Sequence, residues 1–539
     1  MSSLRLHAWW GLLRLNLLTM LFISQTTRRF FPWALLLVGS LGIFIWIQSI
    51  DTFPDPDSFY HIEMSRQIAA QGVMTTFPWL QVSTLRDAYI DQHFLYHVFL
   101  IPFTHFFDPI QGTKFAHVLL NTGFIMLAYG LLRRERVPGA FWFAVLLLAS
   151  SPFMFRLNLV KAPVVSLLFL VGGLYLLFRY RYVPLFFLAA GYVWAYGGFS
   201  ILIMASGFYA FVSLVLDAFR LGGRLAWPNI LRASKELRML GVVLAGTTVG
   251  IFINPHFPVN LQFYWQQFVQ IGVVNYQKVI AVGGEWYPYQ WLNLLTSTAL
   301  ITVLVLSSLV LGAAFWRRLG RKQLTLALLF IVFLVFTLKS KRYVEYYVPV
   351  AVIFSAMMFR AVAGDHWKQE WLPLLRRWTR QYLIVTIIVS LYLVIGSVAI
   401  MTKDVKRLHQ DYLSGISTER FAGVGAWMRD HITTGAIVFH SSWDEFPILF
   451  YRSPQAYYIA GLDPTFSYTY NVDLWNSIVD ITTGKQKEGI YQTIRDTFHA
   501  QYVFVESNHA AFNSAVKRTD GFRQVYRDGE AIIYEVVSE

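Results

Sequence analysis

Residues 31–72 read FPWALLLVGSLGIFIWIQSIDTFPDPDSFYHIEMSRQIAAQG. The run over 31–50 is apolar enough and long enough to cross the hydrocarbon core of a bilayer as one helix. The polar residues that follow predict an acidic helix, with Asp55 as N-cap, Pro56 at the first position and Gly72 as the stop. A span that leads at once into such a helix predicts polar chemistry at the membrane surface.

The chain as a whole has the composition of an integral membrane protein. Of its 539 residues, 56% are hydrophobic, 17% are aromatic and only 14% are charged, which is not the balance of soluble domains. The net charge of +14 comes from short basic clusters between apolar runs, so nucleic-acid binding is excluded. The absence of cysteine excludes a disulfide framework, a thiolate metal site and a cysteine nucleophile.

Eleven apolar runs are candidates for transmembrane helices. They cover residues 31–50, 114–132, 139–154, 164–178, 183–196, 198–216, 237–253, 292–315, 323–338, 345–362 and 383–401. The segment 93–107 is apolar but too short, and we interpret it as an interfacial helix.

Basic clusters decide the orientation of these spans. The clusters lie in alternate loops, near residues 28–29, 133–136, 179–181, 220–238, 317–322 and 368–380. The positive-inside rule places these loops in the cytoplasm. The amino terminus is then cytoplasmic, and after an odd number of spans the carboxyl-terminal segment lies outside.

The chain divides into two expected domains, a transmembrane domain over 1–401 and a soluble extracytoplasmic α/β domain over 402–539. The tail holds 13 Lys+Arg and 17 Asp+Glu, whereas the chain as a whole is basic. Its pattern predicts a helix over 418–431, strands over 436–440 and 501–506, and a hairpin in which RDGE (527–530) joins FRQVY to AIIYEV.

The first outer loop, residues 51–113, carries seven acidic and two basic residues. Within it, Asp57 and His61 lie four residues apart and share one face of the expected helix. Asp55 as N-cap and Asp57 in the first turn could simply stabilise the helix terminus, without any chemical role. Alternatively, carboxylates fixed at a helix terminus serve as a general base or as ligands of a hard cation. Asp91, His93 and His97 follow in DQHFLYH (91–97), where a lone histidine is more often an interfacial residue than a ligand.

Two basic clusters at outer helix ends go against the positive-inside bias. Arg156 and Lys161 stand in SPFMFRLNLVKAP (151–163), and KSKRYVEYY (339–347) contains Lys341, Arg342 and Tyr343. Snorkelling to headgroups accounts for single members, but the pair of clusters predicts a bound anion such as a lipid phosphate or pyrophosphate.

Two further outer segments combine acids with aromatics. The long loop 254–290 contains Glu285 within VGGEWYPY, and its aromatic rings suit either a sugar or a membrane belt. SSWDEFP (441–447) places Trp443 and Asp444 in the soluble domain, where they could equally be surface residues.

The arrangement resembles the GT-C superfamily of polytopic glycosyltransferases, which use polyprenyl-phosphate or polyprenyl-pyrophosphate sugars. DPDSFYH (55–61), directly after the first span, is similar to the aspartate motif of that family, in particular of the catalytic subunit of oligosaccharyltransferases. The resemblance implies that Asp55 and Asp57 orient the acceptor, act as base or bind metal. It also implies that Glu285 is the acid of the mobile loop and that Arg342 binds the donor phosphate.

Two departures from that family concern the acceptor. SSWDEFP lacks the second tryptophan and the Tyr-Gly of the WWDYG signature, and Arg156 and Lys161 stand where oligosaccharyltransferases have acids in the second outer loop. These departures disfavour asparagine-linked transfer, and the expected acceptor is a glycan, a lipid or a protein.

We therefore expect a membrane glycosyltransferase, inverting by the resemblance, that acts on the extracytoplasmic face. Arg342, Lys341, Arg156 and Lys161 would hold the donor phosphate, and Asp57 with Asp55 and Glu285 would carry the chemistry. Residues expected on the acceptor side are His61, Asp91, His93, Tyr343, Trp443 and Asp444. Mg²⁺ or Mn²⁺ is expected only if Asp55, Asp57 and Glu285 converge, and otherwise no cofactor.

Three alternatives stay open. They are an oligosaccharyltransferase acting on protein, a transporter or lipid flippase, and a scaffold whose outer charges form no common cavity. Short loops and the lack of eukaryotic targeting signals favour a bacterial inner membrane, and membrane lipids are expected as neighbours.

Overall fold

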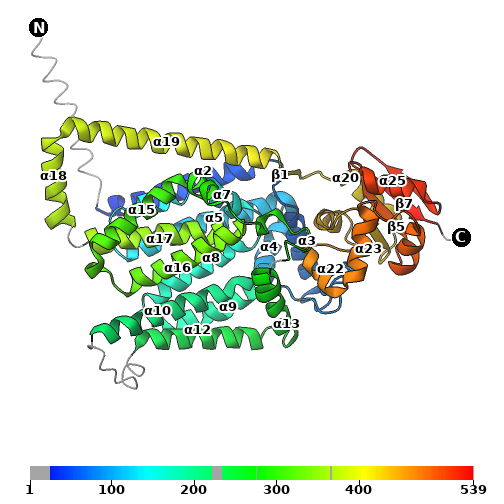
Figure 1. Cartoon of the computed structure of the whole chain (residues 1–539), viewed down its shortest axis with the longest axis horizontal. Coiled ribbons are helices and arrows are strands. Elements are labelled where there is room, and N and C mark those ends of the chain that lie inside the picture. The colour runs from blue at the N-terminus through cyan, green and yellow to red at the C-terminus, as the bar shows by residue number, and fades with distance from the viewer. Residues whose placement is uncertain (1–24, 221–233, 275, 365–366, 538–539) are drawn as a thin grey trace, which may run out of the picture.

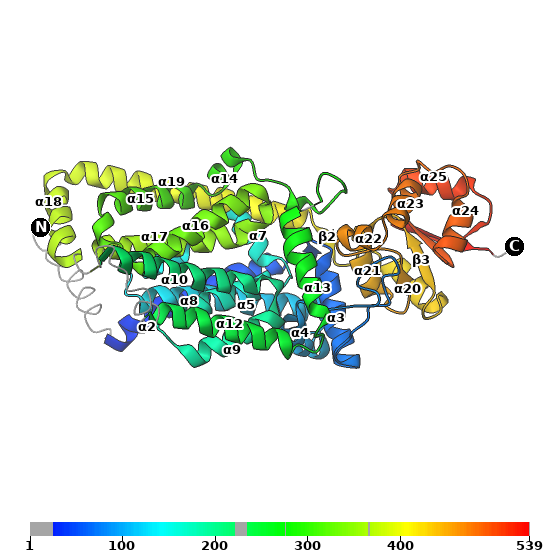
Figure 2. The same cartoon turned by 60° about the horizontal axis from the view of Figure 1, so that its bottom comes forward.

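The computed structural model describes residues 25–220, 234–274, 276–364 and 367–537. Long helices run side by side along the long axis of the molecule, and the carboxyl-terminal domain lies beyond one end of them (Figures 1 and 2). Part of the predicted basic cluster at 220–238, including Arg224 and Arg232, lies outside the described residues.

Every predicted span corresponds to a helix or to a bent pair of helices. In chain order these are α2 (Gln25–Gln48), α5 (Pro109–Arg134), α6 (Ala140–Leu146) with α7 (Ser151–Asn158), α8 (Pro163–Leu177), α9 (Tyr182–Ala195), α10 (Ser200–Arg220), α12 (Lys235–Phe252), α14 (Trp291–Ser297) with α15 (Ala299–Ala314), α16 (Arg321–Lys339), α17 (Val344–Ala363) and α19 (Leu383–Leu413). α18 (Leu372–Gln381) precedes α19.

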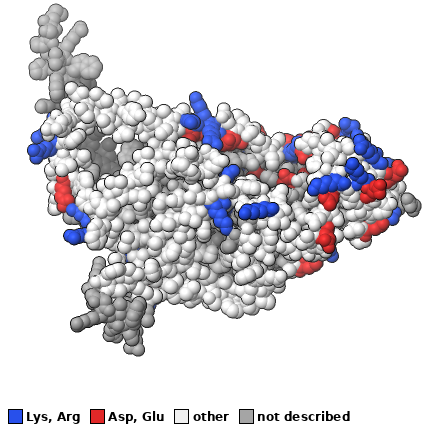
Figure 3. Space-filling view, viewed as in Figure 1, with Lys and Arg blue, Asp and Glu red and all other residues white. Residues whose placement is uncertain are grey.

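The structure supports a multi-pass membrane protein. Within the described residues, six helices are long and apolar enough to cross a membrane, or eight if each bent pair is one span. α8 and α9 are shorter apolar helices, so the count of eleven stays a prediction. On the face drawn in Figure 3, much of the helical body shows neither acidic nor basic residues, as expected of a surface that faces lipid.

Shorter elements build the outer end of the helical body. α3 (Asp57–Gln71) begins one residue later than the predicted start at Pro56, and it ends as expected before Gly72, which has φ 75°. α4 (Phe94–Phe106) coincides with the predicted interfacial helix. α13 (Val259–Trp265), a π-helical segment (Gln266–Val274) and the turns η3 (Gly284–Trp286) and η5 (Lys341–Tyr343) complete this end.

The carboxyl-terminal domain contains a five-stranded mixed sheet in the order β4-β3-β5-β7-β6. β3 (Ile437–His440) pairs in parallel with β4 (Tyr457–Tyr458) and with β5 (Tyr502–Glu506). β6 (Phe522–Arg527) and β7 (Ala531–Val536) form the predicted antiparallel hairpin. The helices of this domain are α20 (Ala422–His431), α21 (Phe446–Arg452), α22 (Pro464–Tyr470), α23 (Val472–Thr482), α24 (Ile490–Gln492) and α25 (Ala510–Arg518).

The first outer loop binds this domain to the helical body. β1 (Thr52–Phe53) pairs antiparallel with β2 (Ile416–Ser417), and the Trp79 indole N–H donates to the Pro454 carbonyl at 2.6 Å. Phe77 packs against Phe446 at a ring-centroid distance of 6.0 Å. The expected domain boundary at 401–402 falls inside α19, which runs to Leu413.

Candidate functional site

A cavity of about 900 Å³ lies where the outer helix ends meet the carboxyl-terminal domain. All but one of the residues that the sequence proposes for the site line this single cavity. They are Asp55, Asp57, His61, Asp91, His93, Arg156, Lys161, Glu285, Lys341, Arg342, Trp443 and Asp444. A scaffold predicts outer charges that share no cavity, so this convergence counts against that alternative.

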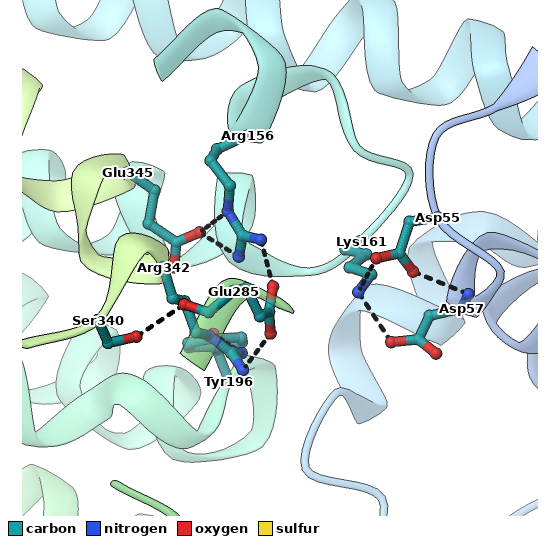
Figure 4. A network of polar contacts seen from close by, with 9 residues as sticks. All are labelled: Asp55, Asp57, Arg156, Lys161, Tyr196, Glu285, Ser340, Arg342 and Glu345. Atoms are coloured by element: carbon teal, nitrogen blue, oxygen red, sulfur yellow. Dashed lines mark hydrogen bonds and ion pairs between the residues drawn. The ribbon is translucent and has the colours of Figure 1, made fainter. Parts of the chain in front are cut away.

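Asp55, Asp57 and Lys161 form one side of the polar cluster in Figure 4. Lys161 Nζ lies 2.8 Å from Asp55 Oδ2 and 2.8 Å from Asp57 Oδ2. The backbone N–H of Asp57 donates to Asp55 Oδ1 at 2.9 Å. Asp55 thus accepts from the first residue of α3, but its predicted place as N-cap was wrong, because Pro56 holds that position without a side-chain cap bond.

The charge states within this group are unequal. Burial raises the pKa of Asp57 to about 6, against the opposing attraction of the Lys161 ammonium. Burial alone would lower the pKa of Lys161, but Asp55 and Asp57 raise it above its ordinary value. Lys161 is thus a fixed cation, and Asp57 is a carboxylate that can take up a proton near neutral pH.

Arg156 and Arg342 meet Glu285 on the other side of the cluster (Figure 4). Arg342 Nη1 lies 3.0 Å from Glu285 Oε1, and its Nη2 donates to the Tyr196 hydroxyl at 2.9 Å. The Arg342 guanidinium also lies 4.8 Å from the ring centroid of Trp286. Burial alone would raise the pKa of Glu285, but Arg156, Arg342 and Lys161 together lower it.

Glu345 is a site residue that the sequence analysis missed. Its side chain is 1% exposed and accepts from Arg156 Nη2 at 2.9 Å. It stands in the first turn of α17, three residues after Arg342, within an apolar span. A carboxylate in that position is costly without a partner, and this was the available signal. Tyr196 and Trp286 were not proposed individually, although Trp286 directly follows Glu285 in VGGEWYPY.

The remaining proposed residues lie outside the polar cluster of Figure 4. Lys341 lines the cavity with an exposed side chain, and its backbone N–H donates to Tyr287 O at 3.0 Å. Tyr343 does not line the cavity, and its ring packs on Phe336 with centroids 5.1 Å apart. Tyr343 is the last residue of η5, and its ring lies against α16. Trp443 and Asp444 reach the cavity from the carboxyl-terminal domain.

Histidines from α3 and α4 gather beside Asp91. The Asp91 Oδ2 atom lies 2.7 Å from His97 Nδ1, and His97 Nε2 lies 2.8 Å from His61 Nδ1. The His93 ring stacks on Tyr196 with centroids 5.5 Å apart. Burial lowers the pKa of His93 to about 3 and places that of His61 well below its ordinary value, so both rings are neutral.

The carboxylates do not fit the divalent cation that the sequence allowed for. The Lys161 ammonium already lies between Asp55 and Asp57, and the Glu285 carboxylate faces two guanidinium groups. Among the described residues, the group of side chains placed to share a cation is His61, His93 and His97. No step of the chemistry is therefore assigned to Mg²⁺ or Mn²⁺ on Asp55, Asp57 and Glu285.

No family model and no curated protein matches this chain. Solved structures similar to it include three membrane proteins. The archaeal oligosaccharyltransferase AglB from Archaeoglobus fulgidus, in complex with an inhibitory peptide and a dolichol-phosphate, matches with a TM-score of 0.63 at 13% identity, over 94% of this chain and 74% of that one. ArnT from Cupriavidus metallidurans, bound to undecaprenyl phosphate, matches with a TM-score of 0.56 at 14% identity, over 94% and 98% of the two chains.

The third is the arabinofuranosyltransferase AftD from Mycobacteria, with a TM-score of 0.51 and 13% identity over 94% of this chain and 41% of that one. All three are membrane glycosyltransferases of the GT-C superfamily. The fold of this chain is therefore the GT-C fold.

Proposed function

We propose that the protein is a glycosyltransferase that moves a sugar or glycan from a polyprenyl-phosphate or polyprenyl-pyrophosphate donor to an acceptor at the extracytoplasmic face. The observation that carries the proposal is one cavity lined both by Asp57, of raised pKa, and by the Arg342 and Arg156 guanidinium groups. A base and an anion-binding group in one partly enclosed space are what glycosyl transfer from a phosphate requires.

Arg342 is the principal donor ligand in this proposal. Its guanidinium is fixed by Tyr196 and Trp286 and is turned towards the cavity. Guanidinium groups bind phosphate oxygens through paired charge-assisted hydrogen bonds. Arg156 and Lys341 add positive charge nearby. AglB and ArnT were each solved with a polyprenyl-type phosphate, which agrees with a lipid-phosphate donor.

Asp57 acts on the acceptor. The acceptor hydroxyl attacks the anomeric carbon, its proton passes to the Asp57 carboxylate, and the bond from that carbon to the phosphate oxygen breaks. The departing phosphate carries the developing charge, which Arg342 stabilises. The Lys161 ammonium limits the rise in the pKa of Asp57 to about 6. The carboxylate is therefore ionised at neutral pH. Attack from the face opposite the phosphate gives inversion.

We assign the helical region 1–401 to donor binding and catalysis, and the domain 402–539 to closing the cavity and meeting the acceptor through Trp443 and Asp444. The cavity then opens outside a bacterial inner membrane, with the amino terminus in the cytoplasm. A protein acceptor is the second candidate because of the likeness to AglB. Arg156 and Lys161, bound here to acids, are the features that disfavour it.

The test measures binding and turnover of polyprenyl-phosphate and polyprenyl-pyrophosphate sugars by the purified protein. Asp57→Asn is expected to abolish turnover and retain donor binding, whereas Arg342→Ala is expected to lose donor binding. Asp87→Asn and Arg86→Ala are matched controls, since this pair lies outside the cavity with exposed side chains. If no lipid-linked sugar binds, or if both site variants behave like the controls, the proposal fails.

A further inference from the structure

Three histidines meet in the wall of the cavity. His61 lies on α3, one turn after Asp57, while His93 and His97 stand four residues apart at the start of α4. One ring nitrogen of each lies within 4.8 Å of the others. His61 and His97 are buried, and His61 and His93 line the cavity.

Asp91 orients two members of this cluster. Its Oδ2 atom lies 2.7 Å from His97 Nδ1, which leaves His97 Nε2 turned to His61. Its Oδ1 atom accepts from the backbone N–H of His93 at 2.9 Å. A carboxylate on the far nitrogen of an imidazole is the usual support of a metal-binding histidine, because it fixes the tautomer and the ring orientation.

We propose that His61, His93 and His97 form a three-nitrogen site for a transition-metal dication, with Zn²⁺ as the ion that fits best. Neutral imidazoles suit Zn²⁺, whereas Mg²⁺ and Mn²⁺ prefer oxygen ligands. Three protein ligands leave the fourth tetrahedral position open. Because His61 and His93 line the cavity, that position faces the space in which the donor phosphate and acceptor would meet.

The site needs a rearrangement to close on the ion, in which the three nitrogens, now within 4.8 Å of one another, move by up to about 1.5 Å relative to one another. His61 Nδ1 and His97 Nε2 are hydrogen-bonded at 2.8 Å. Ligand nitrogens at about 2.0–2.1 Å from a tetrahedral ion stand about 3.3 Å from each other, so these rings separate by roughly half an ångström. The hydrogen now shared between the two nitrogens moves to the other nitrogen of His61, while His97 keeps its hydrogen towards Asp91.

The same contacts allow a competing arrangement. Asp91, His97 and His61 form a chain of hydrogen bonds that could carry a proton without any metal. His93 distinguishes the two, because its ring has a place in a three-nitrogen site but no place in that chain. Its contact with Tyr196 is a ring stack and not a hydrogen bond.

The experiment uses the full-length protein in detergent, with any affinity tag removed and metal stripped by a chelator. Zn²⁺ binding is measured by calorimetry, and Co²⁺ is added separately to look for the visible bands of four-coordinate cobalt. We expect one equivalent of high-affinity binding in the wild type and a loss of at least a hundredfold in His93→Ala. Asp91→Asn should weaken binding by about 10–100-fold.

His105→Ala is the matched control, since His105 stands on the same helix α4 with an exposed side chain and outside the cluster. It should bind like the wild type, and thermal melting should show all variants folded. The proposal is overturned if the wild type takes up no stoichiometric Zn²⁺ or Co²⁺, or if a folded His93→Ala binds as tightly as the wild type. No sugar donor enters the measurement, so its result is independent of the proposed transferase activity.

Discussion

Arg156 and Glu345 stand 189 positions apart in the chain, and their side chains meet at 2.9 Å inside the protein. Arg156 is 8% exposed and Glu345 is 1% exposed. Among the described residues, Glu345 Oε1 has no hydrogen-bond partner. Arg156 is therefore the direct ion-pair partner on which this carboxylate depends in the protein interior.

Replacing Arg156 by Ala should destabilise the protein strongly. An uncompensated buried charge costs about 3–5 kcal/mol in unfolding free energy. The double variant Arg156→Met with Glu345→Leu should recover most of that loss, because no charge is then left unpaired. Denaturant unfolding in detergent measures both. Arg523→Ala, which breaks an exposed pair with Glu535, is the control, and an equal loss in control and single variant would contradict the prediction.

The pH dependence of turnover should report on Asp57. Its pKa is raised to about 6, and the base must be ionised, so kcat/KM should fall as pH decreases through about 6. Lys161→Met removes a cation that lowers this pKa and should move the acidic limb to higher pH. Asp55→Asn removes a like charge that raises it and should move the limb to lower pH.

The shift of the acidic limb should be about 1–3 pH units in Lys161→Met, because the two charges are in direct contact. It should be smaller in Asp55→Asn. The measurement is a pH profile of kcat/KM for wild type and both variants. Shifts in the same direction for the two variants would show that another group carries the limb.

In the proposed function, Glu285 would compete with the donor phosphate for Arg156 and Arg342. In the present arrangement its carboxylate contacts both Arg156 and Arg342, so an incoming phosphate has to displace it. Glu285→Gln should therefore bind a short-chain polyprenyl phosphate more tightly, by on the order of tenfold, or about 1.4 kcal/mol. Asp444→Asn is the control, because Asp444 lines the same cavity with an exposed side chain. Weaker binding in Glu285→Gln would indicate that Glu285 orients Arg342 for the phosphate.

Much of the membrane body could be predicted because apolar runs and basic loops are local signals. Two bends between consecutive helices could not be predicted. α6 and α7 are bent by 77°, and α14 and α15 by 97°. Pro152 at the start of α7 is a local mark of the first bend. The second falls at Thr298 without proline or glycine, so packing and not local sequence sets it.

The sequence predicted on which side of the membrane the candidate site lies, but it did not predict which site residues pair with one another. The topology placed Asp57, Lys161 and Arg342 on one face, and the cavity brings them together. Lys161 binds the two aspartates because the turn between α7 and α8 brings it beside the start of α3, a pairing that no local pattern predicts. Glu345 was hidden by its apolar neighbours. The histidine cluster joins residues 32 and 36 positions apart, beyond any local pattern.

α9 and α12 pack closely through two glycines of α12. A Cβ atom at Gly246 of α12 would lie 2.3 Å from the Phe186 carbonyl oxygen of α9, and one at Gly250 would lie 2.6 Å from the Ala190 carbonyl oxygen. This spacing of small residues lets the two backbones approach each other. Gly246→Ala should therefore force α9 and α12 apart and cost about 1–3 kcal/mol. Gly241→Ala, on the same helix with no atom within 4 Å of its Cβ position, should be neutral or stabilising by up to about 1 kcal/mol. Thermal unfolding in detergent compares them, and equal melting temperatures would mean that α9 and α12 are not packed this closely.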